Sequence, residues 1–159
     1  MAKKTTTPMN PHEREAYQHA RAGIRLGTEA DYAGAAEAWR QASDIADAHL
    51  ALTDMYFWIK SGYGAALCDA GHHQKSIAVS ELAREWTLAQ RQPLASLSIA
   101  RAYLALGDGA AAAPFLREVY GLIGDALFEQ FDEALGADLH AAIAGLENGG
   151  ARPLTERPK

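Results

Sequence analysis

A short pattern of small and large residues occurs three times along this chain of 159 residues, at intervals of 41 and 36 residues. In each copy a small residue is followed three positions later by a large one, then by a turn, and then by further small residues at helical spacing. The small residues are Gly23, Gly64 and Ala100, and the large ones are Leu26, Leu67 and Tyr103. Self-similarity at a period of 20–50 residues indicates stacked helical units, which mostly serve as surfaces that hold other molecules. The pattern therefore predicts a repeat architecture and makes an enzyme the less expected outcome.

The whole region between residues 12 and 147 is predicted to be helical. It is rich in Ala, Leu, Glu and Arg and contains no run of β-branched residues, so we expect an all-α fold. Six helices are expected at residues 12–27, 32–47, 53–70, 73–91, 94–106 and 110–123, with one or two more between 125 and 147 that break near Gly136. Asp31 and Thr53 are predicted N-caps, whereas Gly27 and Gly71 are predicted helix ends. The stretch 47–53 contains neither Gly nor Pro, so the boundary there is the least marked.

The two ends of the chain lack helical periodicity. Residues 1–11 contain Lys, Thr and two prolines, and residues 148–159 contain two glycines and two prolines. Such segments bury too little apolar surface to offset the entropy lost on ordering. We therefore expect a flexible arm at 1–11, a single helical domain at 12–147 and a disordered tail at 148–159.

The composition argues against several classes of partner. A net charge of -5 does not suit a nucleic-acid-binding protein, which needs a basic face. No run approaches the roughly 18 apolar residues that span a bilayer, and residues 1–10 lack the apolar core of a secretory signal. The single cysteine, Cys68, cannot form an internal disulfide, which fits a reducing compartment. We expect a cytoplasmic protein whose partner is another protein, not a nucleic acid or a membrane.

The spacing of the small residues resembles the tetratricopeptide-repeat family, which pairs two antiparallel helices in each repeat of about 34 residues. Besides the residues named above, the resemblance is carried by small residues at the twentieth and twenty-seventh repeat positions. These are Ala35, Ser76 and Ala112, and then Ala42, Ala83 and Val119. The match covers about residues 16–123, and only Gln92-Pro93 is similar to the family's closing proline. The resemblance implies a short right-handed solenoid of about three helix pairs, followed by C-terminal capping helices.

The resemblance also implies a binding groove, because the first helix of each repeat lines the concave face in this family. The residues that the family pattern places there include Tyr17 and Ile24, then Trp58 and Asp69, then Leu94, Leu97 and Arg101. Aromatic and arginine side chains are typical anchors of protein interfaces. The alternative is that Trp58 and Leu97 pack inside, against the last helices.

A second surface is acidic. Glu129, Asp132 and Glu133 share one helix face at spacings of three and four residues. This face could contact a basic partner, although a solvated helix surface is the alternative.

Little in the sequence points to chemistry. Cys68, His72 and His73 are the one cluster of metal-ligand type, but a zinc site needs at least three ligands in defined geometry. The alternative, that Cys68 is a small apolar residue and the histidines lie in a turn, is favoured. No nucleophile beside a base and no phosphate loop is present. We expect no metal, no cofactor and no catalysis, with a helical metal-dependent enzyme as the remote alternative.

A more specific resemblance suggests a role. The stretch from Val119 to Glu133 contains a tyrosine, glycines, a phenylalanine and acidic residues, and is similar to the closing segment of tetratricopeptide-type immunity proteins of bacterial polymorphic toxin systems. The implied function is to bind and neutralise a cognate toxin. The alternatives are a type III secretion-type chaperone or a general adaptor that holds a secreted client in the groove. Because apolar grooves also self-associate, a homodimer is a further alternative.

Overall fold

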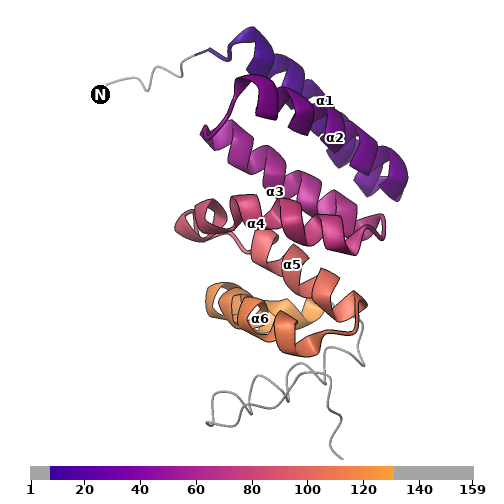
Figure 1. Ribbon diagram of the computed structural model, residues 1–159, viewed down its shortest axis with the longest axis vertical. Coiled ribbons are helices and arrows are strands. Elements are labelled where there is room, and N and C mark those ends of the chain that lie inside the picture. Colours follow the sequence, from indigo (N-terminus) through magenta and orange to yellow (C-terminus); the bar gives the residue numbers. More distant parts are fainter. Residues whose placement is uncertain (1–7, 131–159) are drawn as a thin grey trace, which may run out of the picture.

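The computed structural model describes residues 8–130, and in this part of the chain helices are joined by short turns and no strand is present (Figure 1). The elements are α1 (Pro11–Thr28), α2 (Tyr32–His49), α3 (Asp54–Asp69), α4 (His73–Ala89), α5 (Leu94–Ala105), α6 (Gly109–Ile123) and the 3₁₀ helix η1 (Gly124–Gln130). The predicted all-α class is confirmed, and each of the six helices lies within two residues of its predicted bounds. Most of the expected helical segment 125–147 and the tail 148–159 lie outside the described residues, as does most of the arm 1–11. The described start of the segment, 125–130, is 3₁₀ rather than α-helical.

Polar caps explain where the helices begin. The side chains of Asn10, Asp31, Thr53 and Asp108 each accept a hydrogen bond from the backbone N–H three residues later, at 2.8–3.2 Å. Such a bond satisfies one of the N–H groups that a helix start leaves without an intrahelical partner. The predicted caps Asp31 and Thr53 are therefore confirmed.

The residues that end the helices agree less well with the prediction from glycine positions than the caps do. Gly71 has a positive φ of 87°, as expected of a glycine that ends a helix. The prediction that Gly27 ends the first helix is wrong, because α1 continues to Thr28 and the left-handed residue is Ala30, with φ of 61°. In the turn after α2, which contains neither Gly nor Pro, Leu52 takes the same role with φ of 63°.

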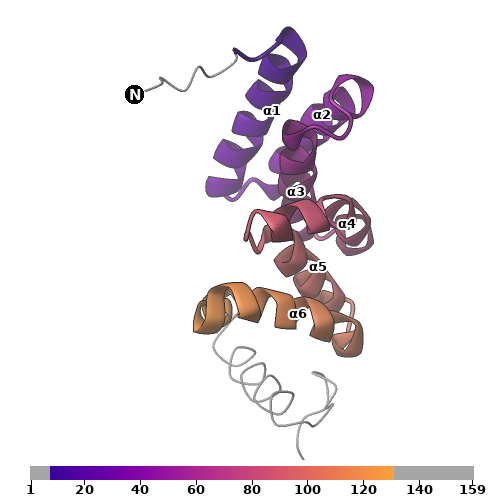
Figure 2. The ribbon, with the colours of Figure 1, turned by 90° about the vertical axis from the view of Figure 1, so that its left-hand side faces the viewer.

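The helices are stacked in order along the long axis of the molecule (Figures 1 and 2). Each helix packs against the next one in the sequence, and α3 also packs against both α1 and α5. The odd-numbered helices therefore form a row of neighbours, with α2 and α4 joining successive members of that row.

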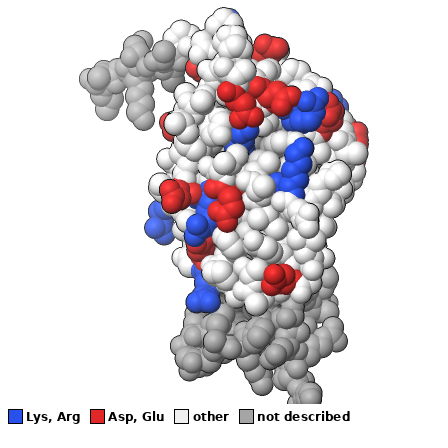
Figure 3. All heavy atoms as spheres, in the orientation of Figure 1, with Lys and Arg blue, Asp and Glu red and all other residues white. Residues whose placement is uncertain are grey.

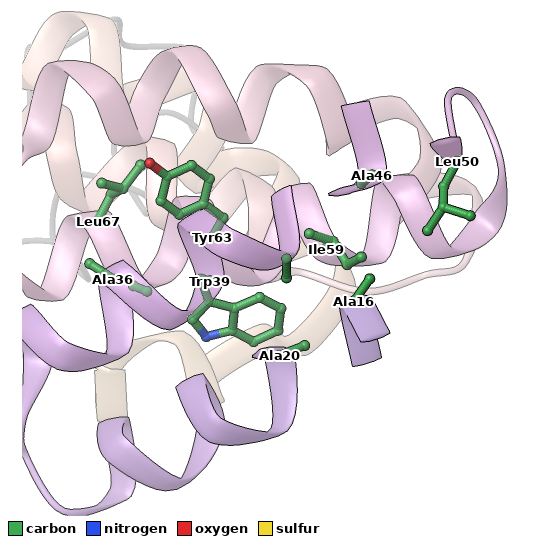
Figure 4. Close-up of a cluster of buried hydrophobic side chains, with 11 residues drawn as sticks. Ala16, Ala20, Ala36, Trp39, Ala46, Leu50, Ile59, Tyr63 and Leu67 are labelled. Carbon is green, nitrogen blue, oxygen red and sulfur yellow. The ribbon is translucent and has the colours of Figure 1, made fainter. Parts of the chain in front are cut away.

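The first core is built around one indole ring. Trp39 of α2 is 6% exposed and lies among small and apolar side chains from α1 and α3, including Ala20, Ile59 and Tyr63 (Figure 4). Gly23 of α1 and Gly62 of α3 both face it. A Cβ atom at either glycine would lie 2.5 or 2.3 Å from an atom of the indole, closer than real Cβ contacts allow. The two glycines therefore let α1 and α3 approach the ring from two sides.

A second core and a partly buried ion pair hold the other half. Leu97 of α5 packs with a cluster that continues through α6 to Leu127 of η1. Arg84 of α4 pairs with Glu118 of α6, and the hydroxyl of Ser96 on α5 donates to Glu118 Oε2 at 2.8 Å. Partial burial alone would raise the pKa of Glu118, but the hydrogen bonds from Arg84 and Ser96 outweigh it and lower that pKa. This carboxylate thus joins three helices.

We predict that Gly62→Ala destabilises the protein, although alanine favours a helix over glycine by about 1 kcal/mol. The new methyl group must displace the Trp39 ring, and overpacking of this kind costs about 1–3 kcal/mol. Gly27→Ala is the matched control, because no atom lies within 4 Å of its Cβ position, and it should hold or raise stability. Urea unfolding followed by circular dichroism measures both. A Gly62→Ala protein at least as stable as the Gly27→Ala protein would contradict the packing described for Trp39.

We predict that Glu118→Gln lowers stability at pH 7 by about 2 kcal/mol, the scale of hydrogen bonds to a charged group. Because the native pKa of Glu118 is lowered from 4.5, the carboxylate stabilises the fold above pH 4.5, and this contribution is lost as the pH falls through the native value. The gap between wild type and variant should therefore narrow below pH 4.5. Unfolding curves at several pH values test this, with the exposed Glu15→Gln as control. A gap that does not change with pH would contradict the ionic role of Glu118.

Candidate functional site

A cleft of about 190 Å³ lies over the Trp39 core, where α1, α2, α3 and the start of α5 meet. We call it the glycine cleft; it is lined by Gly23, Ile24, Gly27, Tyr32, Ala35, Trp39, Gly62, Ala65, Ala66, Asp69 and Leu94. Three large apolar side chains line it while staying open to solvent: Ile24 is 48% exposed, Tyr32 44% and Leu94 39%. A concave site with apolar walls and few polar groups is typical of a binding site.

A second hollow, of about 320 Å³, is almost entirely apolar. We call it the aromatic pocket; it is lined by Tyr17, Asp54, Met55, Trp58 and Trp86. The rings of Tyr17 and Trp58 lie 6.0 Å apart, and Trp86 Nε1 donates to Asp54 Oδ1 at 3.0 Å. That hydrogen bond fixes the indole of α4 beside the start of α3, so the pocket has walls from three helices.

The two hollows lie on the same face of the same two helices. Tyr17 and Ile24 are seven residues apart on α1, and Trp58 and Ala65 are seven residues apart on α3. Residues seven apart lie almost directly above one another, two helical turns or about 11 Å apart. The aromatic pocket and the glycine cleft therefore lie on one side of the α1–α3 pair, and we call the two hollows together the α1–α3 groove.

Four of the residues predicted to bind a partner line this groove: Tyr17, Ile24, Trp58 and Asp69. Leu94, which the resemblance placed on the same face, also lines it. Trp58 is half-buried, with its ring against Trp39 at 5.5 Å between centroids, so it serves both the core and the groove.

The remaining predicted residues lie elsewhere. Leu97 is 8% exposed and packs in the second core. The prediction that its side chain lines the groove is therefore wrong, and the alternative, that Leu97 packs inside, is correct. Arg101 donates to Asp69 at 3.0 Å, which links α5 to the edge of the glycine cleft. Glu129 is exposed on η1, while Asp132 and Glu133 lie outside the described residues.

The sequence pattern missed Tyr32, Asp54 and Trp86. The resemblance assigns the groove to the first helix of each pair, whereas Tyr32 begins α2 and Trp86 lies near the end of α4. The contact between Trp86 and Asp54 joins residues 32 apart, so no local spacing reveals it. Only the packing of the end of α4 against the start of α3 brings them together.

Charges near the groove are few and partly cancelled. The Asp69–Arg101 pair is about one-third exposed on both sides, which makes it worth about 0–1 kcal/mol. On the face drawn in Figure 3, acidic and basic side chains are interspersed and do not gather into a patch of one sign. Because most of the lining of the glycine cleft is apolar and its one charged residue, Asp69, is paired, apolar contact is the main interaction that this cleft offers.

The cysteine–histidine cluster does not assemble a metal site within residues 8–130. Cys68 is buried, and this burial raises the pKa of its thiol. His72 is exposed at the start of α4, and no three side chains of His, Cys, Asp or Glu come together in the part that the structure describes. Cys68 therefore behaves as a small core residue.

Comparisons with known proteins give no relative for this chain: no protein-family model, no curated protein and no solved structure matches it. In the described range 8–130, none of the helices combines the length and the apolarity needed to cross a bilayer. The function must therefore be inferred from the groove itself.

Proposed function

We propose that this chain is a non-catalytic protein-binding module that holds a segment of a partner polypeptide in the α1–α3 groove. The supporting observation is the glycine cleft, where Ile24, Tyr32 and Leu94 stand partly exposed around a hollow floored by Trp39. Proteins usually bury large apolar side chains, so a group of them left exposed around a cleft is typical of a site where another molecule binds. An extended chain crossing the cleft would remove all three from water.

The same proposal includes the architecture. Consecutive helices pack as pairs and α1, α3 and α5 form a row, which suits a short right-handed solenoid of tetratricopeptide-like helix pairs with the odd-numbered helices toward the partner. Apart from Tyr32, Trp39, Ala35 and Trp86, the groove residues belong to those odd-numbered helices. In such a stack the width of the groove depends on how closely neighbouring helix pairs approach each other.

The most specific form of the proposal is a bacterial, cytoplasmic immunity protein that neutralises a cognate toxin. It rests on the resemblance of residues 119–133 to the closing segment of such proteins, and on a net charge of -5, which suits a basic toxin. The alternative is a secretion-type chaperone or an adaptor, which an extended groove also suits. An immunity protein abolishes the activity of a folded toxin, whereas a chaperone keeps an unfolded client soluble, so an activity assay on the partner separates them.

We predict that Gly27→Leu blocks partner binding without harming the fold. Gly27 lines the glycine cleft and nothing lies within 4 Å of its Cβ position, so a leucine there fills the cleft rather than the core. Leucine also favours a helix over glycine. Affinity purification from the source organism should recover a partner with wild-type protein, and at least about tenfold less with Gly27→Leu, a loss of about 1.4 kcal/mol.

Ala78→Leu is the matched control, because it adds a leucine at an exposed position of α4 outside both hollows. It should retain the partner. If Gly27→Leu binds the partner as wild type does, the groove is not the binding face and the proposal fails. If the wild-type protein elutes as a dimer that Gly27→Leu converts to a monomer, the occupant of the groove is a second copy of this chain.

A further inference from the structure

We propose that the aromatic pocket is a subsite for a basic side chain, a lysine or arginine of the bound partner segment. This inference rests on the proposed function, since it names the chemistry of the residue held in one of the two hollows of the α1–α3 groove. It is carried by the combination of ring faces and a carboxylate in one otherwise apolar hollow.

The lining of the pocket has the composition that binds organic cations. Tyr17, Trp58 and Trp86 supply three aromatic rings, and the negative faces of such rings attract ammonium and guanidinium groups. Asp54 supplies a carboxylate that accepts a hydrogen bond at Oδ1 from Trp86. Asp54 lies in the first turn of α3 and is exposed to solvent, so a charged side chain with a long apolar stem can place its stem along the rings and its charge at this carboxylate.

The charge next to the pocket limits where the cation can lie. The guanidinium of Arg21 lies 5.9 Å from the ring centroid of Tyr17, so the chain already places one cation on this aromatic surface. A second cation beside Arg21 would be repelled. The incoming group therefore fits best between Trp58 and Trp86, with its charge toward Asp54 and its stem along the rings.

The distance between the two hollows sets the spacing of the partner residues. They are separated by two helical turns of α1 and of α3, or about 11 Å. A partner segment in the polyproline II conformation has three residues per turn and advances about 3.1 Å per residue, so side chains three residues apart face the same side, about 9 Å apart. A basic residue in the aromatic pocket is therefore followed or preceded, three residues away, by a large apolar residue in the glycine cleft. We infer a recognition motif of basic–x–x–apolar, readable in either direction.

Synthetic peptides test this directly. The probe is the capped octapeptide Gly-Ser-Lys-Ser-Gly-Leu-Ser-Gly, titrated into the full chain labelled with ¹⁵N. The chain has three tryptophans, so the indole N–H signals of Trp58 and Trp86 report on the aromatic pocket and that of Trp39 on the core below the cleft. We expect the Trp58 and Trp86 signals to shift on binding. Replacing Lys by norleucine, which keeps the stem and removes the ammonium, should weaken binding about fivefold or more.

Asp54→Asn separates charge from shape, because its amide oxygen can still accept from Trp86 Nε1. It should weaken the lysine peptide severalfold and leave the norleucine peptide unchanged. Asp44→Asn is the matched control, since it removes the same charge from α2 outside the groove, and it should alter neither. A peptide in which Lys and Leu are adjacent should bind as weakly as one without Leu.

The inference is overturned if norleucine binds as well as lysine, if Asp54→Asn has no more effect than Asp44→Asn, or if no lysine peptide moves the Trp58 and Trp86 signals. None of these results bears on the proposed function, which the capture experiment with Gly27→Leu tests separately. If Gly27→Leu still abolishes capture of the natural partner, the groove binds polypeptide but the aromatic pocket does not select a cation.

Discussion

The packing of one indole between two glycines determines how α1, α2 and α3 pack and what surface they leave open. Trp39 is buried because Gly23 and Gly62 present no side chain to it, so α1 and α3 can both contact the same ring. Close packing of this kind tolerates little added volume. The same absence of side chains keeps the surface above the ring hollow, and the glycine cleft is a direct consequence of how the core is packed.

The groove continues because helical periodicity repeats the arrangement two turns away. Tyr17 and Trp58 line the aromatic pocket, and Ile24 and Ala65, seven residues further along the same two helices, line the glycine cleft. The glycine cleft is lined mainly by small and aliphatic residues, and its carboxylate, Asp69, is paired with Arg101, whereas three rings and Asp54 line the aromatic pocket. Two chemically distinct subsites fix the position of a bound chain, which an evenly apolar groove cannot, and the order of the basic and apolar residues in that chain then sets its direction.

The sequence predicted what local chemistry determines. Helix starts follow from caps such as Asp31 and Thr53, and the groove positions on α1 and α3 are those that the resemblance to tetratricopeptide repeats implies. Gly27 misled because glycine is compatible with a helix interior as well as with its end, and Ala30 could take the left-handed conformation instead. Leu97 and Trp86 depend on which helices pack against α5 and α3, and that contact between distant segments carries no local signal.

The claim that most needs testing is that a partner polypeptide lies in the groove between α1 and α3. Site-specific photo-crosslinking in the source organism measures this, with a benzophenone amino acid placed at Ile24, which is already large and 48% exposed beside the glycine cleft, or at Ala78 on the exposed side of α4. We predict a discrete crosslinked partner from position 24 and none from position 78. Crosslinking from position 78 alone would contradict the assignment and place the binding face elsewhere.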